Sequence, residues 1–168
     1  MRRGARYAAN TDVSSEASKA EIERTLKRYG ATSFGYATDE RERALVQFKA
    51  CGRFVRFILI MPKRSEFYYR AAANQHAGMQ RTPAEVDAAY EQAIRQSWRA
   101  MLLIIKAKLE AVEAKIVTFE DEFLPYTVLP NGETVAEWMQ PQVDEAYKSG
   151  LMPTNLLALA PPKDLSNV

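Results

Sequence analysis

The sequence predicts an α+β fold in which a small antiparallel sheet packs against one unusually long helix. Three segments between residues 32 and 61 are rich in β-branched and aromatic residues and are separated by short turns. Apolar residues then recur at helical spacing from Val86 to Ile116. We therefore expect a helix-β-β-β meander of three to four strands, the long helix beside it and a short C-terminal helix.

The first helix is expected to run from about Ser15 to Tyr29, because Ile22, Leu26 and Tyr29 lie along one helical stripe. Ser18 has capping-box spacing to Glu21, which leaves a later start open. Gly30 suits the left-handed position that ends a helix.

Strands are expected over residues 32–37, 43–49 and 53–61, with Ala50-Cys51-Gly52 as a tight hairpin turn. The third strand places Phe54 and Arg56 on one face, because side chains alternate along a strand. The alternative is that Phe54 belongs to the core and the arginines solvate an edge strand.

The long helix is expected to begin at Thr82, which caps it, with Pro83 in the first turn and Glu85 closing a capping box. It should extend over about 34 residues, or roughly 50 Å. Residues 119–123 are expected to continue or cap this helix, and residues 126–129 could form a fourth strand. Thr134 and Glu137 form a second capping box, Pro141 is expected to restart that helix, and Gly150 to end it.

The expected organisation is one domain over residues 14–150, with residues 62–81 as a long loop. Residues 1–13 form a flexible basic arm, and residues 151–168 an apolar, proline-rich tail. The single cysteine favours the cytoplasm, since one thiol forms no internal disulfide. No apolar run approaches the length of a membrane span, so we expect no membrane insertion.

The net charge of +2 is unevenly distributed. Residues 1–82 hold 16 Lys and Arg against 8 Asp and Glu, whereas residues 83–168 hold 7 against 13. A basic half attracts polyanions, although the two halves could equally attract each other within the fold.

No catalytic, metal or cofactor motif stands out. Cys51 and His76 are the only such pair for thiol chemistry; they could meet in the fold, but nothing in their spacing indicates that they do. Glu113 and Lys115 imitate the end of a nuclease motif, but two residues that are two apart on a helix do not face each other. We expect a protein that needs no cofactor and more readily fits a binding role than catalysis, and an enzyme of a class without a recognisable motif stays open as a third hypothesis.

Basic and aromatic residues of the N-terminal half predict nucleic-acid binding, because cations contact phosphates and aromatic rings stack on unpaired bases. Single-stranded DNA is the expected ligand, with RNA as the other possibility. The expected contact residues are Arg2, Arg3, Arg6, Lys49, Arg53, Arg56, Lys63, Arg64, Tyr68, Tyr69, Arg70 and Arg81.

The segments 6–14, 20–31, 98–100, 105–113 and 128–135 resemble uncharacterised small accessory proteins of tailed bacteriophages and prophages. The resemblance implies action in the host cytoplasm, in replication or recombination. It equally implies a second hypothesis, an inhibitor or adaptor that binds a host or phage protein complex through the acidic C-terminal half. The expected partner-binding residues are then Glu120, Asp121, Glu122, Leu156 and Leu157. Self-association into a homo-oligomer is a further possibility, because so long a helix could leave an apolar stripe uncovered.

Overall fold

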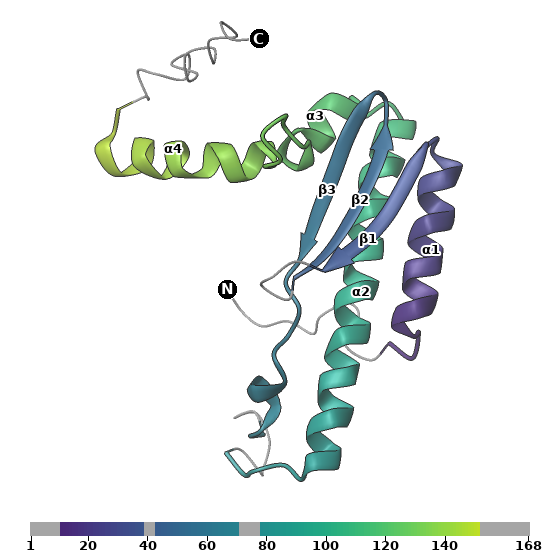
Figure 1. Ribbon diagram of the computed structural model, residues 1–168, viewed down its shortest axis with the longest axis vertical. Helices are drawn as coiled ribbons and strands as arrows, with labels where there is room; N and C mark the ends of the chain where they lie inside the picture. Colours follow the sequence, from purple (N-terminus) through teal and green to yellow (C-terminus); the bar gives the residue numbers. More distant parts are fainter. Residues whose placement is uncertain (1–10, 39–42, 71–77, 152–168) are drawn as a thin grey trace, which may run out of the picture.

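The α+β architecture is confirmed in a computed structural model that describes residues 11–38, 43–70 and 78–151 (Figure 1). An antiparallel sheet in the order β1-β2-β3 packs on helices. The elements are α1 (Ser15–Arg28), β1 (Ser33–Thr38), β2 (Ala44–Ala50), β3 (Arg53–Leu59), the 3-10 turn η1 (Arg64–Phe67), α2 (Pro83–Glu113), α3 (Phe119–Phe123), the 3-10 turn η2 (Leu124–Tyr126) and α4 (Val135–Ser149).

The register of the sheet follows from the two-residue turn between β2 and β3. Cys51 and Gly52 both have positive φ, 48° and 73°, as the tight hairpin turns that match strand twist require. Ala50 therefore pairs with Arg53, and Lys49 with Phe54. The fourth strand expected over 126–129 is wrong, because Thr127 forms only an isolated bridge to Val55 before the chain turns away.

Helix α1 begins after Ser14, whose Oγ accepts a hydrogen bond from the N–H of Ala17. The later start at Ser18 is wrong, since Ser18 lies inside the helix and is fully buried. Gly30 has a φ of 83°, and the chain leaves the helix there as expected.

Helix α2 begins as predicted, with a capping box between Thr82 and Glu85. It ends at Glu113 and spans 31 residues, because Lys115 adopts a left-handed φ of 57° that turns the chain back. Ile116, expected within the helical stripe, is consequently 75% exposed. Residues 119–123 do not continue α2, because Thr118 caps them as the separate helix α3.

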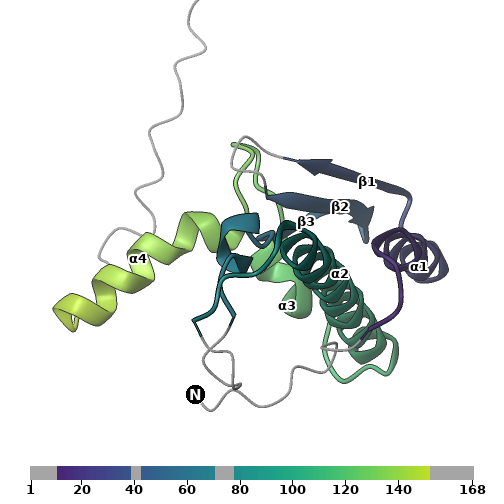
Figure 2. The ribbon, with the colours of Figure 1, turned by 90° about the horizontal axis from the view of Figure 1, so that it is seen from below.

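The core lies between one face of the sheet and the two helices α1 and α2 (Figure 2). Ile22 and Leu26 of α1 meet Leu102 and Ile105 of α2 in this layer. Phe123 of α3 inserts at one end, with its ring 5.9 Å from that of Phe48 and 6.2 Å from that of Phe57. The aromatic cluster thus fixes α3 to the sheet.

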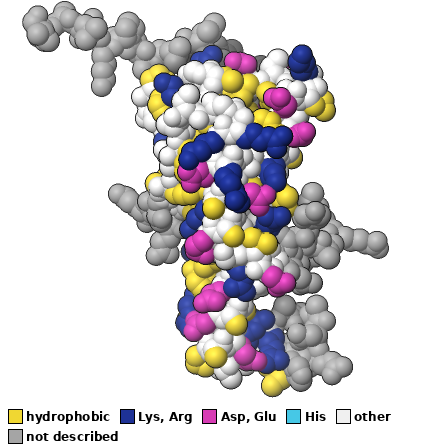
Figure 3. All heavy atoms as spheres, turned by 90° about the vertical axis from the view of Figure 1, so that its right-hand side faces the viewer, with side chains coloured by type: hydrophobic (Ala, Val, Ile, Leu, Met, Phe, Trp, Pro, Cys, Tyr) yellow, Lys and Arg dark blue, Asp and Glu magenta, His cyan; other side chains and the backbone are white. Residues whose placement is uncertain are grey.

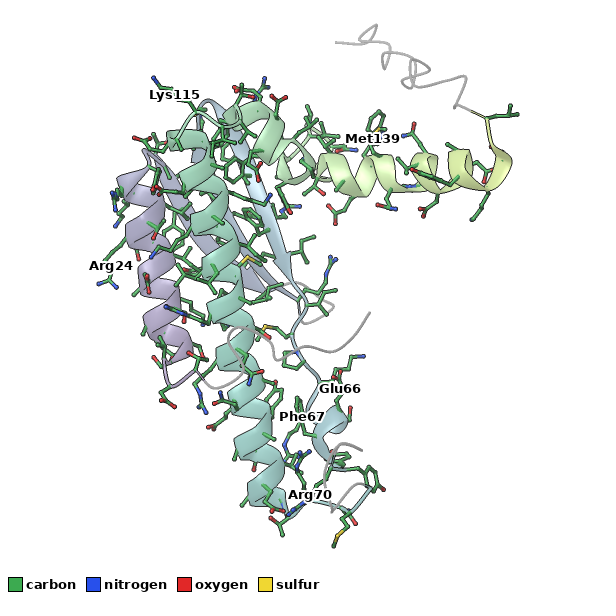
Figure 4. All side chains as sticks on the ribbon, turned by 180° about the vertical axis from the view of Figure 1, so that it is seen from behind. Arg24, Glu66, Phe67, Arg70, Lys115 and Met139 are labelled. Carbon is green, nitrogen blue, oxygen red and sulfur yellow. The ribbon has the colours of Figure 1, made fainter. Side chains whose placement is uncertain are left out.

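The segment 62–81, expected to be a long loop, contains η1 and a bridge between Tyr69 and Gln80. Phe67 packs against Tyr90 of α2 at a ring distance of 6.1 Å. The described parts of this segment, residues 62–70 and 78–81, therefore lie along the N-terminal half of α2 (Figure 4).

Helix α4 projects sideways from the body, and none of its residues is buried (Figure 1). Thr134 and Glu137 form the predicted capping box, and Gly150 ends the helix with a φ of 69°. The expected restart at Pro141 is wrong, because Pro141 lies inside one continuous helix. Proline has no backbone N–H, so one carbonyl of the preceding turn lacks its helical hydrogen bond. Because α4 is exposed, a water molecule can donate to that carbonyl instead.

Replacing Phe123 with Ala should remove the anchor of α3. The ring is completely buried, so its loss should lower the free energy of unfolding by about 3–5 kcal/mol. Chemical denaturation measures the difference. Leu124→Ala, at a side chain that is 54% exposed, should cost about 0.5 kcal/mol or less. Equal losses at both positions would contradict the assigned role of Phe123.

Candidate nucleic-acid interface on the open face of the sheet

The two faces of the sheet have different surroundings. Val46, Phe48, Val55 and Phe57 point toward α1 and α2 and are buried. The alternating residues point to the other face, which no helix in the described part of the chain covers (Figures 1 and 2). Leu45, Gln47 and Lys49 of β2 and Phe54, Arg56 and Ile58 of β3 lie on this outer face.

Phe54 is the exposed aromatic residue of the outer face. Its side chain is 56% exposed, which excludes the alternative that it belongs to the core. Lys49 lies opposite it on β2, with its Nζ 5.2 Å from the ring centre. A cation and an accessible ring therefore stand side by side on a flat surface.

Arg56 lies one step further along the same face and is held by the turn that precedes α4. Its Nη1 donates a hydrogen bond of 2.7 Å to the carbonyl of Gly132. Glu137 is nearby: the backbone N–H of Thr134 lowers the pKa of its carboxyl most, and the charges of Arg43 and Arg56 add to this effect. The charge of Arg56 is thus partly balanced within the fold.

The second group of predicted contact residues lies at the N-terminal end of α2, where acidic residues engage its cations. Arg64 Nε donates to Asp87 Oδ1 at 2.7 Å, and this hydrogen bond raises the pKa of the guanidinium. Arg70 pairs with Glu85, and Arg81 donates to main-chain carbonyls. Lys63 is exposed, as are Tyr68 and Tyr69 at 43% and 61%.

The structure does not gather those predicted contact residues that it describes into one surface. Lys49, Arg53 and Phe54 lie at the hairpin end of the sheet, whereas the group from Lys63 to Arg81 lies at the opposite end (Figures 1 and 4). Arg2, Arg3 and Arg6 lie outside the described residues. On the α1 side of the molecule, cations and carboxylates are intermixed rather than separated (Figure 3).

The acidic residues proposed for partner binding are partly engaged. Glu122 accepts a hydrogen bond from Lys108 Nζ at 2.7 Å, and Asp121 accepts one from the hydroxyl of Thr118. Glu120 is exposed. Leu156 and Leu157 lie outside the described residues, so the hypothesis of a protein partner at this surface stays a prediction.

The remaining chemical candidates form no site among the residues that the structure describes. Cys51 is exposed in the hairpin turn, and His76 lies outside the described residues. Within the ranges that the structure describes, no three His, Cys, Asp or Glu side chains are placed to share a metal ion. Those ranges likewise contain no helix with both the length and the apolarity of a membrane span.

Sequence reasoning left Gln47 out of the candidate site. It pairs with Arg56 across the hairpin and completes a row of polar side chains beside Phe54. The expected turn included Ala50, whereas the turn consists of Cys51 and Gly52 alone, and this one-residue difference changes which residues face each other across the hairpin. Sequence reasoning also left out Glu21, whose carboxylate joins α1 to α2 through Lys106 and Arg99 at 2.8 and 2.9 Å.

The Glu21 contacts should make stability depend on pH. The hydrogen bond from Lys106, aided by Arg99, lowers the pKa of the Glu21 carboxyl below its usual 4.5. A carboxyl with a lowered pKa stabilises the fold above its unfolded pKa and loses this contribution as the pH falls through its folded pKa. Glu21→Gln should therefore cost about 1–3 kcal/mol at pH 7 and progressively less below about pH 4.5.

Urea denaturation at pH 7, 5 and 3 measures this difference. Glu120→Gln is the control, because its exposed carboxylate has no ion pair with a described residue. A cost of Glu21→Gln that is the same at every pH would indicate lost packing rather than lost charge.

Comparisons with known proteins identify no relative of this chain. The chain matches no protein-family model, no curated protein and no solved structure. The resemblance to phage accessory proteins stays a prediction. The function must therefore be argued from the residues of the open sheet face.

Proposed function

We propose that this chain is a non-enzymatic accessory protein that binds single-stranded nucleic acid on the outer face of its sheet. The observation that carries the proposal is the Phe54 ring, 56% exposed and beside the ammonium of Lys49. Single strands are bound by this combination, because the ring stacks on a base and the cation contacts a phosphate. A phage role in DNA replication or recombination is consistent with this activity.

Each residue of the face has a distinct proposed role. Phe54 stacks on an unpaired base, and Lys49 contacts a phosphate beside it. Arg53 is not part of this face, because it pairs with the buried Ala50 and therefore points to the other side of the sheet. The Lys49 ammonium ends a flexible stem, so it can move to a phosphate when a base takes its place over the ring. Gln47 and Arg56 supply hydrogen-bonding groups beside the stacked base.

The neighbouring edge strand leaves room for the ligand. Ser33, Gly35 and Ala37 of β1 point to the same outer face and are exposed, with small side chains. A strand of nucleic acid can therefore cross β1 at close range before its base reaches Phe54. A duplex keeps its bases stacked on one another, so this surface should prefer single strands.

Phe54→Ala should weaken binding to a fluorescein-labelled single-stranded DNA of 20 nucleotides. Base stacking on an aromatic side chain contributes about 1–3 kcal/mol, which corresponds to a roughly 5- to 150-fold increase in Kd. Fluorescence anisotropy at 50 mM salt measures the change. DNA and RNA strands of the same sequence should be compared in parallel.

Tyr69→Ala is the matched control for Phe54→Ala. Tyr69 is 61% exposed and lies at the opposite end of the molecule, so its loss should leave the Kd unchanged. A loss at Tyr69 but not at Phe54 would move the site to the N-terminal end of α2. Absence of binding by the unmodified chain would reject the proposal.

Lys49→Ala should reduce the salt dependence of binding. Each phosphate contact on a single strand contributes about −0.7 to the slope of log K against log salt, because it releases a condensed counterion. The variant slope should be shallower by about 0.7, measured between 50 and 200 mM salt. Lys63→Ala, at an exposed lysine of the other group, should leave the slope unchanged. An unchanged slope for Lys49→Ala would remove this lysine from the site.

A further inference from the structure

Strand β3 is an edge strand of the sheet, and the part of this edge toward its C-terminal end pairs with no other strand in the described part of the chain. The carbonyl of Phe54 points away from β2 and accepts a hydrogen bond from the N–H of Val128. Arg56 and Ile58 have the same orientation, because backbone groups alternate along a strand. The isolated bridge between Val55 and Thr127 occupies the edge as far as the N–H of Arg56. Beyond it, the carbonyl of Arg56 and the outward N–H and C=O groups of Ile58 have no backbone partner among the described residues.

This free edge is unusually apolar. Residues 57–61 read Phe-Ile-Leu-Ile-Met, and Ile60 is 78% exposed. Edge strands of monomeric proteins are normally protected by charge, proline or a covering element, since an unprotected edge pairs with another chain. Pro62 follows only after this run. The composition is that of a strand with neighbours on both sides.

An apolar groove of about 660 Å³ adjoins the same end of β3. It lies between the end of the strand, η1 and the middle of α2. Leu59, Phe67, Leu103 and Ile104 contribute to its walls, and Glu66 is the charged residue of its lining. Ile104 remains 44% exposed.

Helix α4 carries an apolar stripe that packs on no described element along its outer half. Met139, Val143 and Tyr147 recur at intervals of four residues, and Leu151 continues the row. Val143, Tyr147 and Leu151 are 38%, 88% and 72% exposed. The helix extends beyond the β3 edge at the end opposite the groove (Figures 1 and 4).

We propose that a second copy of this chain occupies the β3 edge, in a two-fold symmetric dimer. Antiparallel pairing of the two free edges, residues 56–60 of each copy, centres the axis on Ile58 and gives one continuous sheet. Antiparallel pairing also inverts one copy relative to the other. The projecting α4 of each copy then lies at the end of the partner that carries the groove, and its apolar stripe covers that groove.

A stable dimer needs more buried area than the strand edge alone provides, so we expect the strand pairing and the contacts between α4 and the groove to form together. A specific interface buries about 800 Å² on each partner, which five residues of strand edge do not provide alone. Two reciprocal contacts between α4 and the groove add apolar surface at both ends of the strand pairing. In this arrangement the strand edge is paired, the groove is covered and the apolar stripe of α4 is buried.

Sedimentation equilibrium of the full chain tests the dimer. The unmodified protein should have a mass of about 38 kDa, twice the 19.0 kDa of one chain. Ile60→Lys, at the strand edge, and Tyr147→Lys, on α4, should each shift the mass toward 19.0 kDa, with unchanged circular dichroism. Ile116→Lys, at an equally exposed isoleucine outside the interface, should remain dimeric.

A mass of 19.0 kDa for the unmodified protein at tens of micromolar would overturn the proposal. Dimers that persist in both lysine variants, or that are lost equally in Ile116→Lys, would also overturn it. In either case another partner or another surface would have to account for the free edge.

Disulfide trapping tests the register independently. In a Cys51→Ser background, Ile58→Cys places two thiols at the two-fold axis, where facing Cα atoms about 5.5 Å apart fit a disulfide. Mild oxidation should produce a covalent dimer on a non-reducing gel. Ala37→Cys, on the opposite edge strand β1, should remain monomeric. No cross-link at position 58, or equal cross-linking at position 37, would overturn the proposed pairing.

Discussion

The packing of α1 and α2 on a single face of the sheet determines most of the remaining structure. Two helices form one layer, and one layer covers only one face of three strands. Side-chain alternation then places Phe48 and Phe57 in the core and Lys49, Phe54 and Arg56 on the uncovered face. The candidate interface is thus a consequence of the fold, because the same alternation that fills the core exposes Phe54.

Local signals allowed much of the fold to be predicted from the sequence. The capping boxes at Thr82 and Thr134 involve residues within a few positions of each other, and the hairpin turn was predicted to within one residue, since the expected turn also included Ala50. Errors arose where the chain departs from local preferences. Lys115 ends α2 in a left-handed conformation that glycine usually supplies, and Pro141 is tolerated within an exposed helix.

The sequence alone did not show which charged side chains would remain free on the surface, because the residues that form the ion pairs are far apart along the chain. Arg64 and Arg70 of the basic half pair with Asp87 and Glu85 of the acidic half. Glu21 reverses the pattern by pairing with Arg99 and Lys106. The imbalance between the halves is therefore partly cancelled within the fold. Among the described residues, several cations of the basic half are therefore engaged within the fold, and the register of the hairpin places Lys49 beside Phe54 on the outer face.

The proposed dimer and the proposed binding face use different parts of the sheet and are compatible. Pairing through residues 56–60 occupies the β3 edge, and the contacts of α4 lie in the helix layer. The outer face of the sheet therefore stays accessible in both copies. A two-fold axis perpendicular to the sheet places both outer faces on the same side. A single strand of nucleic acid could then contact the Phe54 rings of both copies. Dimerisation would thereby raise the effective concentration of the second site, which compensates for the few cations that each copy presents.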